Sequence, residues 1–374
     1  MEKRSSGRLK FFLGILGAII GLHAIVLVLI VSSSSSDKKT EEKSEKKQNA
    51  EKNTVKKTAH PPKEPNRTPR PAWRYRKKST DPKFGRPFDY SKALRGAMPA
   101  NLVPGDRSTS GIVVDMNSRR VLWEKNSNKP VAIASMSKMM TLLLVMEHLE
   151  RHPKLSLNTR YQVARSVLTL PRSGVVWLDP REAFSLSEYL KCAAVKSAND
   201  AAYQLGLIVS GNEANFVKLM NHRAKELKMS QTNFINAHGL PGNDNRHSVG
   251  SSADMVRLAE HLLEYPFLME CCQTVSSSIR TGERKTVFKN SNNLLRRGLP
   301  GMEGMKTGFT RKAGFCLTFS VNRQNRRIMG CVTGFGTAAE RDAFCKNLIE
   351  WAYNGAPRKA VRNVQYKAVK KGKK

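Results

Sequence analysis

The chain has 374 residues, of which 40% are hydrophobic and 25% are charged, and this suffices for one large domain with additional segments. Its formal net charge is +35, and residues 1–90 hold 21 basic and 9 acidic side chains. Such a balance favours an anionic partner, for example a membrane surface or an acidic polymer. Nucleic acid is not the expected partner, because the sequence has no zinc-finger spacing and no RNA-binding motif with interleaved aromatic residues.

The first 90 residues are predicted to anchor the protein and to space it from a membrane. The 21 residues from Phe11 to Val31 carry no charged side chain, and a helix needs about 20 apolar residues to cross the hydrocarbon core. We expect a transmembrane signal-anchor helix over residues 11–31, after a cytoplasmic basic segment over residues 1–10. The serines after Val31 leave cleavage as an alternative. Residues 32–90 are rich in Ser, Lys, Glu and Pro, which predicts a disordered basic spacer.

Hydrophobic periodicity begins near Asp89 and predicts a domain over residues 91–356, followed by a basic tail over 357–374. Two strands joined by a turn come first. Helices follow, with a break near Ser197, and a hairpin and a closing helix end the domain. Strands at both ends predict a sheet built from distant segments. The expected elements are strands within 110–126, helices within 137–150, 185–209, 212–229 and 252–265, a hairpin over 314–336 and a helix over 339–354.

The six cysteines form no recognisable ligand or redox pattern. None of them has C-x-x-C spacing, which argues against a metal site or a thioredoxin-type motif. We therefore expect free buried thiols, no metal and no cofactor. A disulfide between Cys316 and Cys331 is the alternative for one pair. The six positions are Cys192, Cys271, Cys272, Cys316, Cys331 and Cys345.

Three short motifs follow one another in this domain. They are SMSK at Ser135–Lys138, SAN at Ser197–Asn199 and KTG at Lys306–Gly308. The first opens a predicted helix, the second falls in a predicted break, and the third leads into a predicted strand. Each motif alone is weak evidence, and an RTG at Arg280–Gly282 even mimics the third. All three in order are the signature of serine penicillin-binding proteins and their β-lactamase relatives.

The spacing of the first motif favours a nucleophile with a base beside it. Residues i and i+3 of a helix are neighbours, so Lys138 can reach the hydroxyl of Ser135. Serine needs such a base, and a lysine can act as one only if burial and another cation lower its pKa. Lys306 would supply that cation. Ser137 is out of register with Lys138 and His238 is not required by this chemistry, so we expect both to be structural.

Over residues 108–353 the chain resembles the D-alanyl-D-alanine carboxypeptidases of the low-molecular-mass penicillin-binding proteins. The resemblance rests on ASMSKMMTLLLVME, KSANDAAYQLG (with Ala198 where Gly is usual), FINAHGL, SSADM and the approach to KTG. It implies an α/β (α+β) fold of the penicillin-binding protein and serine β-lactamase type, with an antiparallel sheet flanked by helices and a helical subdomain. It also implies removal of the terminal D-alanine from peptidoglycan stem pentapeptides through an acyl-enzyme, with β-lactams as covalent inhibitors.

The same resemblance implies the roles of the site residues. Ser135 would attack the substrate, Lys138 would take its proton, and Ser197 would relay a proton to the leaving D-alanine. The backbone N–H groups of Ser135 and Phe309 would stabilise the oxyanion. Asn199 would bind the substrate amide, and Lys306, Thr307 and Arg341 its terminal carboxylate. The substrate-binding residues implied in this way are Asn199, Lys306, Thr307, Gly308, Phe309 and Arg341.

The end of the chain differs from that of many family members. These add a β-sandwich domain and an amphipathic membrane helix, whereas a basic tail follows residue 356 here. Anchoring would therefore pass to the N-terminal helix. We expect a single-pass protein of the inner (cytoplasmic) membrane, with the catalytic domain on the periplasmic side.

Three other functions are compatible with parts of this sequence. A β-lactamase of class A needs a Glu-x-x-Leu-Asn loop, which does not occur between Asp200 and Lys306. A D,D-endopeptidase or transpeptidase stays open, because these enzymes share the acylation step and differ only in the acceptor or in the bond cleaved. The alternative without enzymatic activity is an envelope protein whose basic surface binds anionic wall polymers.

Overall fold

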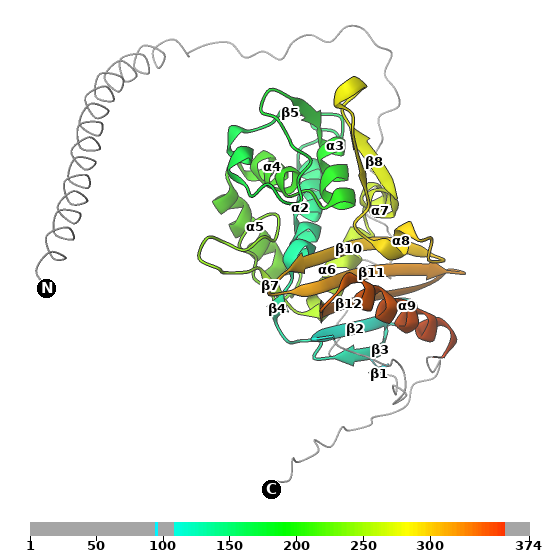
Figure 1. Cartoon of the computed structure of the whole chain (residues 1–374). Coiled ribbons are helices and arrows are strands. Elements are labelled where there is room, and N and C mark those ends of the chain that lie inside the picture. The colour runs from blue at the N-terminus through cyan, green and yellow to red at the C-terminus, as the bar shows by residue number, and fades with distance from the viewer. Residues whose placement is uncertain (1–93, 96–107, 356–374) are drawn as a thin grey trace, which may run out of the picture. The chain divides into compact units, whose positions relative to one another are not determined.

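A six-stranded sheet assembled from both ends of the domain organises the fold (Figure 1). The computed structural model describes residues 94–95 and 108–355. All strand pairs in this sheet are antiparallel except the parallel pair of β1 with β3. The strands come from residues 94–125 and 302–335, so the predicted sheet built from distant segments is confirmed. In spatial order the strands are β1 (Leu94–Arg95), β3 (Arg120–Lys125), β2 (Ser110–Asp115), β12 (Arg326–Phe335), β11 (Gly314–Arg323) and β10 (Met302–Thr310).

Both faces of the sheet are buried. Side chains alternate between the faces of a strand, so Val113 packs toward α9 (Ala338–Asn354) while Ile112 and Val114 pack toward the other helices. The central strands are consequently buried in unbroken runs: all six residues of β2 are buried, as are six consecutive residues in each of β11 and β12.

The helical part of the domain is inserted between β3 and β10. Its central helix, α2 (Lys138–Arg151), is buried from Lys138 through Met146, as expected for a helix surrounded by others. The predicted break is also present: a π-helical turn ends at Lys196, Ser197 has a φ of +67°, and α4 begins at Asn199. The other helices are α3 (Leu186–Lys191), α4 (Asn199–Ser210), α5 (Glu213–Glu226), α6 (Ser252–Leu262), α7 (Pro266–Gln273) and α8 (Asn293–Arg296).

Short strand pairs and single turns complete the described part. The pairs are β4 (Val131–Ala132) with β7 (Val249–Gly250), β5 (Arg160–Gln162) with β6 (Ala183–Ser185), and β8 (Ser276–Ile279) with β9 (Thr286–Lys289). The short helical turns are η1 (Ala134–Ser137), η2 (Arg165–Thr169), η3 (Cys192–Lys196) and η4 (Gly282–Arg284).

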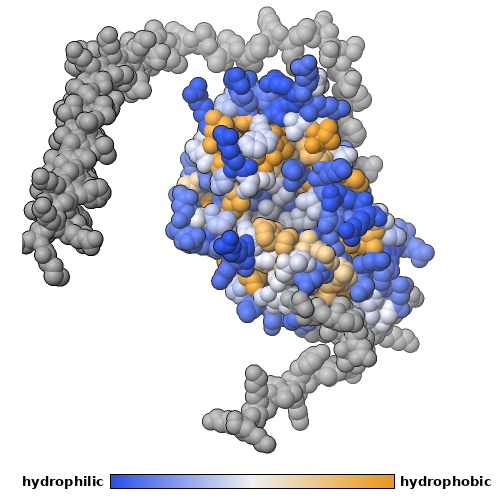
Figure 2. Space-filling view, viewed as in Figure 1, coloured by the Kyte–Doolittle hydropathy of each residue, from blue (hydrophilic) through white to orange (hydrophobic). Residues whose placement is uncertain are grey.

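The surface is mostly hydrophilic, with scattered apolar patches in the view of Figure 2. All six cysteines are free and buried, so the expectation of free thiols is confirmed and Cys316 and Cys331 are not bridged. Within residues 108–355, none of the helices has the length and apolarity to cross a membrane. The transmembrane segment, basic spacer and basic tail that the sequence predicts lie outside the described residues.

Candidate active site

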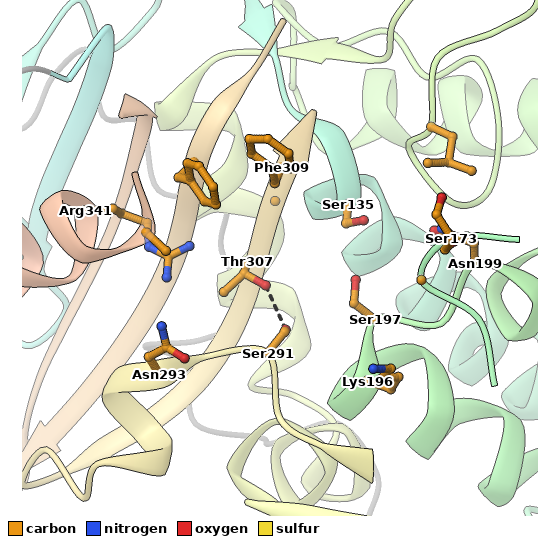
Figure 3. Close-up of a pocket in the computed structure, with 15 residues that line it drawn as sticks. Ser135, Ser173, Lys196, Ser197, Asn199, Ser291, Asn293, Thr307, Phe309 and Arg341 are labelled. Atoms are coloured by element: carbon orange, nitrogen blue, oxygen red, sulfur yellow. Dashed lines mark hydrogen bonds between the residues drawn. The ribbon is translucent and has the colours of Figure 1, made fainter. Parts of the chain in front are cut away.

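A cavity of about 350 Å³ lies where the helical part meets the edge of the sheet, and all three motifs contribute to its lining (Figure 3). The hydroxyl groups of Ser135 and Ser197 point into the same space, with Thr307 on the facing strand. The described residues that line the cavity are Ser135, Ser173, Gly174, Lys196, Ser197, Asn199, Leu240, Ser291, Asn293, Thr307, Gly308, Phe309, Phe315, Ala338 and Arg341.

Ser135 lies in the 3₁₀ turn η1, immediately before α2, and not in the α-helix itself. The turn starts at Ala134, whose φ of +46° is unusual for a residue with a side chain. Ser137 donates its hydroxyl to the Ala134 carbonyl at 2.9 Å and is fully buried. The structural role expected for Ser137 is therefore confirmed, and the hydroxyl that faces the cavity is that of Ser135.

Lys138 is completely buried beneath the cavity, with an exposed fraction of 0%. Its Nζ donates to Ser135 Oγ at 2.9 Å, to Asn199 Oδ1 at 2.7 Å and to the His238 carbonyl at 2.6 Å. These three acceptors use all the donors of an ammonium group. Burial, and secondly the charge of Lys306, lower the pKa of Lys138 well below its ordinary value. The side chain is thus held against the serine, and burial opposes its charged form.

Lys306 lies behind the wall of the cavity. It belongs to β10, is 2% exposed, and donates to the Thr307 carbonyl at 3.1 Å. Burial, with the charge of Arg341, lowers the pKa of Lys306 to about 7. Its ammonium group therefore acts on the site through its charge, whereas the neighbouring Thr307 lines the cavity directly.

Asn199 holds the side chain of Lys138 in place. Its Oδ1 accepts from Lys138, its Nδ2 donates to the Ser173 carbonyl at 2.8 Å, and the side chain is 4% exposed. The resemblance implied contact with a substrate amide, and the structure adds a second task that the sequence did not indicate. The amide group fixes the direction in which Lys138 points.

The wall formed by β10 and α9 carries polar groups from three segments. Thr307 Oγ1 donates to Ser291 Oγ at 2.7 Å. Arg341 reaches the cavity from the first turn of α9, donates to the Cys316 carbonyl at 3.2 Å and pairs with Asp342 at 2.6 Å. Sequence reasoning missed Ser291, which precedes α8 and has no motif of its own. A hydroxyl pair and a guanidinium on one wall suit a carboxylate ligand.

Two aromatic rings lie at the β10 side of the cavity. Phe309 is 55% exposed, and its ring stacks on that of Phe315 with centroids 4.1 Å apart. It belongs to β10, the last strand of the sheet order. An edge strand leaves half of its backbone N–H and C=O groups unpaired within the sheet, so this edge can offer main-chain hydrogen bonds to an extended ligand.

The turn at His238–Gly239 packs against the segment that carries the nucleophile. The imidazole is buried, burial lowers the pKa of His238 to about 3, and Nδ1 accepts from the Leu240 backbone N–H at 3.2 Å, which suits the structural role expected for the ring. Its backbone carbonyl, however, accepts from Lys138. Gly239 has a φ of +82°, and a Cβ there would lie 2.0 Å from the Ala134 carbonyl oxygen. The FINAHGL motif in the sequence did not indicate that this glycine permits the close approach.

Comparisons with known proteins agree with this geometry. The family model described as D-alanyl-D-alanine carboxypeptidase matches residues 100–337. The carboxypeptidase DacF of Bacillus subtilis (strain 168) is 34% identical over 245 residues, which cover 66% of this chain and 62% of that protein. A D-alanyl-D-alanine endopeptidase of Pseudomonas aeruginosa is 30% identical over 220 residues, covering 58% of this chain and 68% of that protein.

A solved structure shows the same fold. Cefotaxime-bound penicillin-binding protein D2 of Listeria monocytogenes is 29% identical, with a TM-score of 0.60 over 67% of this chain and 100% of that chain. The chain spans less than two thirds of the length of the Bacillus relative. The family model, in contrast, covers more than half of this chain. On the motifs, the geometry and these matches, the chain belongs to the D-alanyl-D-alanine carboxypeptidase family of serine peptidases.

Proposed function

We propose that the protein is a penicillin-sensitive serine D-alanyl-D-alanine carboxypeptidase that removes the terminal D-alanine from peptidoglycan stem pentapeptides. The observation that carries the proposal is the buried Lys138 Nζ at 2.9 Å from Ser135 Oγ. A serine attacks a peptide carbonyl only when a base can take its proton. A lysine whose pKa is lowered by burial and by Lys306 can be that base.

Acylation then follows from the positions of these groups. Neutral Lys138 accepts the hydroxyl proton while Ser135 Oγ bonds to the carbonyl carbon of the penultimate D-alanine. Backbone N–H groups of Ser135 and Phe309 receive the oxyanion. The C–N bond breaks, and the proton passes from Lys138, with Ser197 as relay, to the amine of the leaving D-alanine. Water completes the cycle by hydrolysing the ester, which restores the serine.

The terminal carboxylate of the substrate is assigned to the wall of Thr307 and Arg341. Thr307 offers a hydroxyl, and Arg341 keeps donors beside the cavity although Asp342 balances part of its charge. Lys306 adds a positive potential from behind that wall. A group that binds only a free carboxylate selects the end of a stem peptide over its interior, which is the selectivity that a carboxypeptidase needs.

Endopeptidase activity is the second candidate, and the relative from Pseudomonas aeruginosa is the observation that favours it. Acylation by Ser135 is common to both reactions, and only the bond that is presented differs. Mass spectrometry of a pentapeptide and of a cross-linked dimer after incubation separates them. We expect the pentapeptide to lose one alanine and the dimer to stay intact. Cleavage of the dimer alone would favour the endopeptidase, and no reaction with either would contradict both.

We further propose that residues 11–31 anchor the protein in the inner membrane, with the catalytic domain on the periplasmic side. The support is the uncharged 21-residue stretch and the external location of peptidoglycan. A reporter enzyme fused after the domain, active only on one side of the membrane, tests the orientation. Reporter activity on the cytoplasmic side would contradict it.

A further inference from the structure

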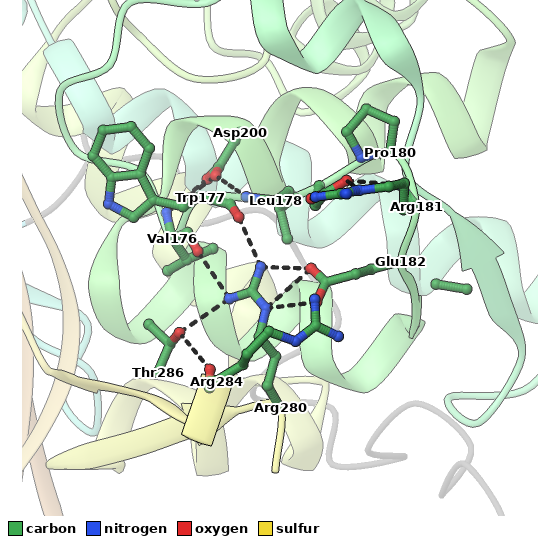
Figure 4. Close-up of polar contacts among 12 residues, drawn as sticks. Val176, Trp177, Leu178, Pro180, Arg181, Glu182, Asp200, Arg280, Arg284 and Thr286 are labelled. Carbon is green, nitrogen blue, oxygen red and sulfur yellow. Dashed lines mark hydrogen bonds and ion pairs between the residues drawn. The ribbon is translucent and has the colours of Figure 1, made fainter. Parts of the chain in front are cut away.

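The RTG sequence that mimics the third motif has a place of its own in the fold. Arg280 follows β8 and has a φ of +67°, so it lies at a sharp turn of the β8–β9 hairpin and not on the catalytic strand. Figure 4 shows its guanidinium at the centre of a polar cluster between this hairpin and the segment that precedes β6. The side chain is 10% exposed, and its partner Glu182 is 9% exposed.

All five N–H donors of this guanidinium are used. Nε and Nη2 donate to the Glu182 carboxylate at 2.9 and 2.7 Å. Nη2 also donates to the Trp177 carbonyl at 2.7 Å, and Nη1 donates to the Val176 carbonyl and Thr286 Oγ1, both at 3.1 Å. The planar fork of arginine serves several acceptors in fixed directions, which the three donors of lysine do not reproduce.

The carbonyls that Arg280 binds belong to residues 173–178, which we call the rim segment. Its other side is held by Asp200, whose carboxylate accepts from the backbone N–H groups of Val176 and Leu178 at 3.1 Å each. Between these bonds Trp177 has a φ of +58°, a conformation that residues with side chains seldom adopt. The segment is therefore fixed from both sides, by α4 and by the hairpin.

The start of the rim segment touches the catalytic groups. Ser173 and Gly174 line the cavity. The Gly174 carbonyl accepts from the Asn199 backbone at 2.7 Å, and the Ser173 carbonyl accepts from the Asn199 side chain. Asn199 in turn accepts from Lys138. The backbone of the rim segment, bonded to Arg280 at one end and to Asn199 at the other, thus connects the hairpin to the base.

We propose that Arg280 is a positioning residue for acylation: its guanidinium locks the rim segment so that Asn199 presents its oxygen to Lys138. The role rests on the proposed function, because it concerns the same serine and lysine. A positioning role differs from a general contribution to stability in its effect on the rate of acylation. A loosened rim segment slows the chemical step in molecules that are folded, since small misplacements of reacting groups are costly.

The experiment measures acylation of the full chain by a fluorescent penicillin at saturating concentration. The first-order rate constant is compared between the wild type and Arg280→Gln. We expect it to fall about ten- to a hundredfold, while the fraction of protein finally labelled stays close to that of the wild type. A purely structural role would do the reverse, lowering the labelled fraction and leaving the rate constant unchanged.

Arg323→Gln is the matched control. Arg323 also makes a bidentate pair, with Glu350 at 2.7 and 3.0 Å, and also donates to a backbone carbonyl, that of Pro300. It lies on β11 and does not line the cavity. We expect a comparable loss of thermal stability in this variant and a rate constant within twofold of the wild type. An equal fall in rate for both variants would overturn the proposal.

Arg280→Lys keeps the charge beside Glu182 but cannot hold both rim carbonyls, so its rate constant should also fall. This variant keeps the proposal testable if Arg280→Gln does not fold. A wild-type rate in Arg280→Lys would overturn the role of Arg280 and leave the proposed function standing. Absence of labelling in the wild type itself would overturn the proposed function and this role with it.

Discussion

Two buried lysines with different surroundings define the site at the scale of single residues. Lys138 has three hydrogen-bond acceptors, and one of them is the hydroxyl of Ser135. Lys306 has the Thr307 carbonyl and lies close to the charge of Arg341. Burial lowers the pKa of both groups, but only Lys138 can reach the serine. This division makes Lys138 the base and Lys306 the source of positive potential.

The pH dependence of acylation should report both lysines. The rate should rise with pH as Lys138 loses its proton, and should fall where Lys306 loses its charge, because the free-enzyme pKa of Lys306 is about 7. In Lys306→Gln the rising limb should move to higher pH, since the cation that lowers the pKa of Lys138 is gone. Rates of acylation by penicillin from pH 5 to 10 test this. A rising limb that does not move would contradict the assignment.

Burial of the charged Lys306 side chain should also lower the free energy of unfolding. Its pKa falls from 10.5 in the unfolded chain to about 7 in the fold, so the unfolded chain holds more protons between these values and wild-type stability rises with pH there. Lys306→Met should therefore stabilise the protein at pH 6 by about 0.5–2 kcal/mol. The gain should shrink toward pH 10.5. Urea unfolding at both pH values checks this, and an equal gain at both would contradict the burial cost.

At the scale of elements, the site depends on how closely three backbone segments approach one another: β10, the turn η1 and the turn at Gly239. Strand β10 comes against η1 at Gly308, where a Cβ would lie 2.8 Å from the Ile133 carbonyl. The turn at Gly239 approaches the same 3₁₀ turn from the helical side. Because these contacts involve backbone atoms, which cannot move aside as a flexible side chain can, glycine is required at both positions.

Gly239→Ala should therefore abolish acylation and destabilise the fold. The new Cβ would lie 2.0 Å from the Ala134 carbonyl and 3.0 Å from the Ser135 nitrogen. Gly211→Ala is the control, since its φ of +78° is similar but no atom lies within 4 Å of the added Cβ. That variant should lose roughly 1–2 kcal/mol from backbone strain and keep its acylation rate. Equal rates in the two variants would show that the close approach is not needed.

Local patterns were enough to find the parts of the site that depend on local geometry. Ser135 and Lys138 are three residues apart at a helix start, and the hairpin of β11 and β12 follows from alternation and a polar turn. Ser173 and Ser291 could not be found in this way. They are ordinary loop serines, and only packing between distant segments brings them to the cavity. The bond from Lys138 to Asn199, 61 positions apart, is of the same kind.

At the scale of the whole molecule, the proposed anchor and the basic tail make different predictions about membrane attachment. Removal of residues 2–31 should move the protein to the soluble fraction, because the uncharged stretch is lost. Removal of residues 357–374 should leave it in the membrane fraction, also after a high-salt wash that screens electrostatic binding. Immunoblots of the fractions check both variants. The opposite distribution would show that the tail is the anchor.

Covalent labelling of Ser135 is the most direct test of the central claim. Ser137 is the internal control, because it lies two residues away with its hydroxyl turned to the Ala134 carbonyl. After incubation with penicillin, intact-mass spectrometry should show one added penicillin on the wild type and on Ser137→Ala, and none on Ser135→Ala. An adduct that survives in Ser135→Ala, or its absence from the wild type, would contradict the account.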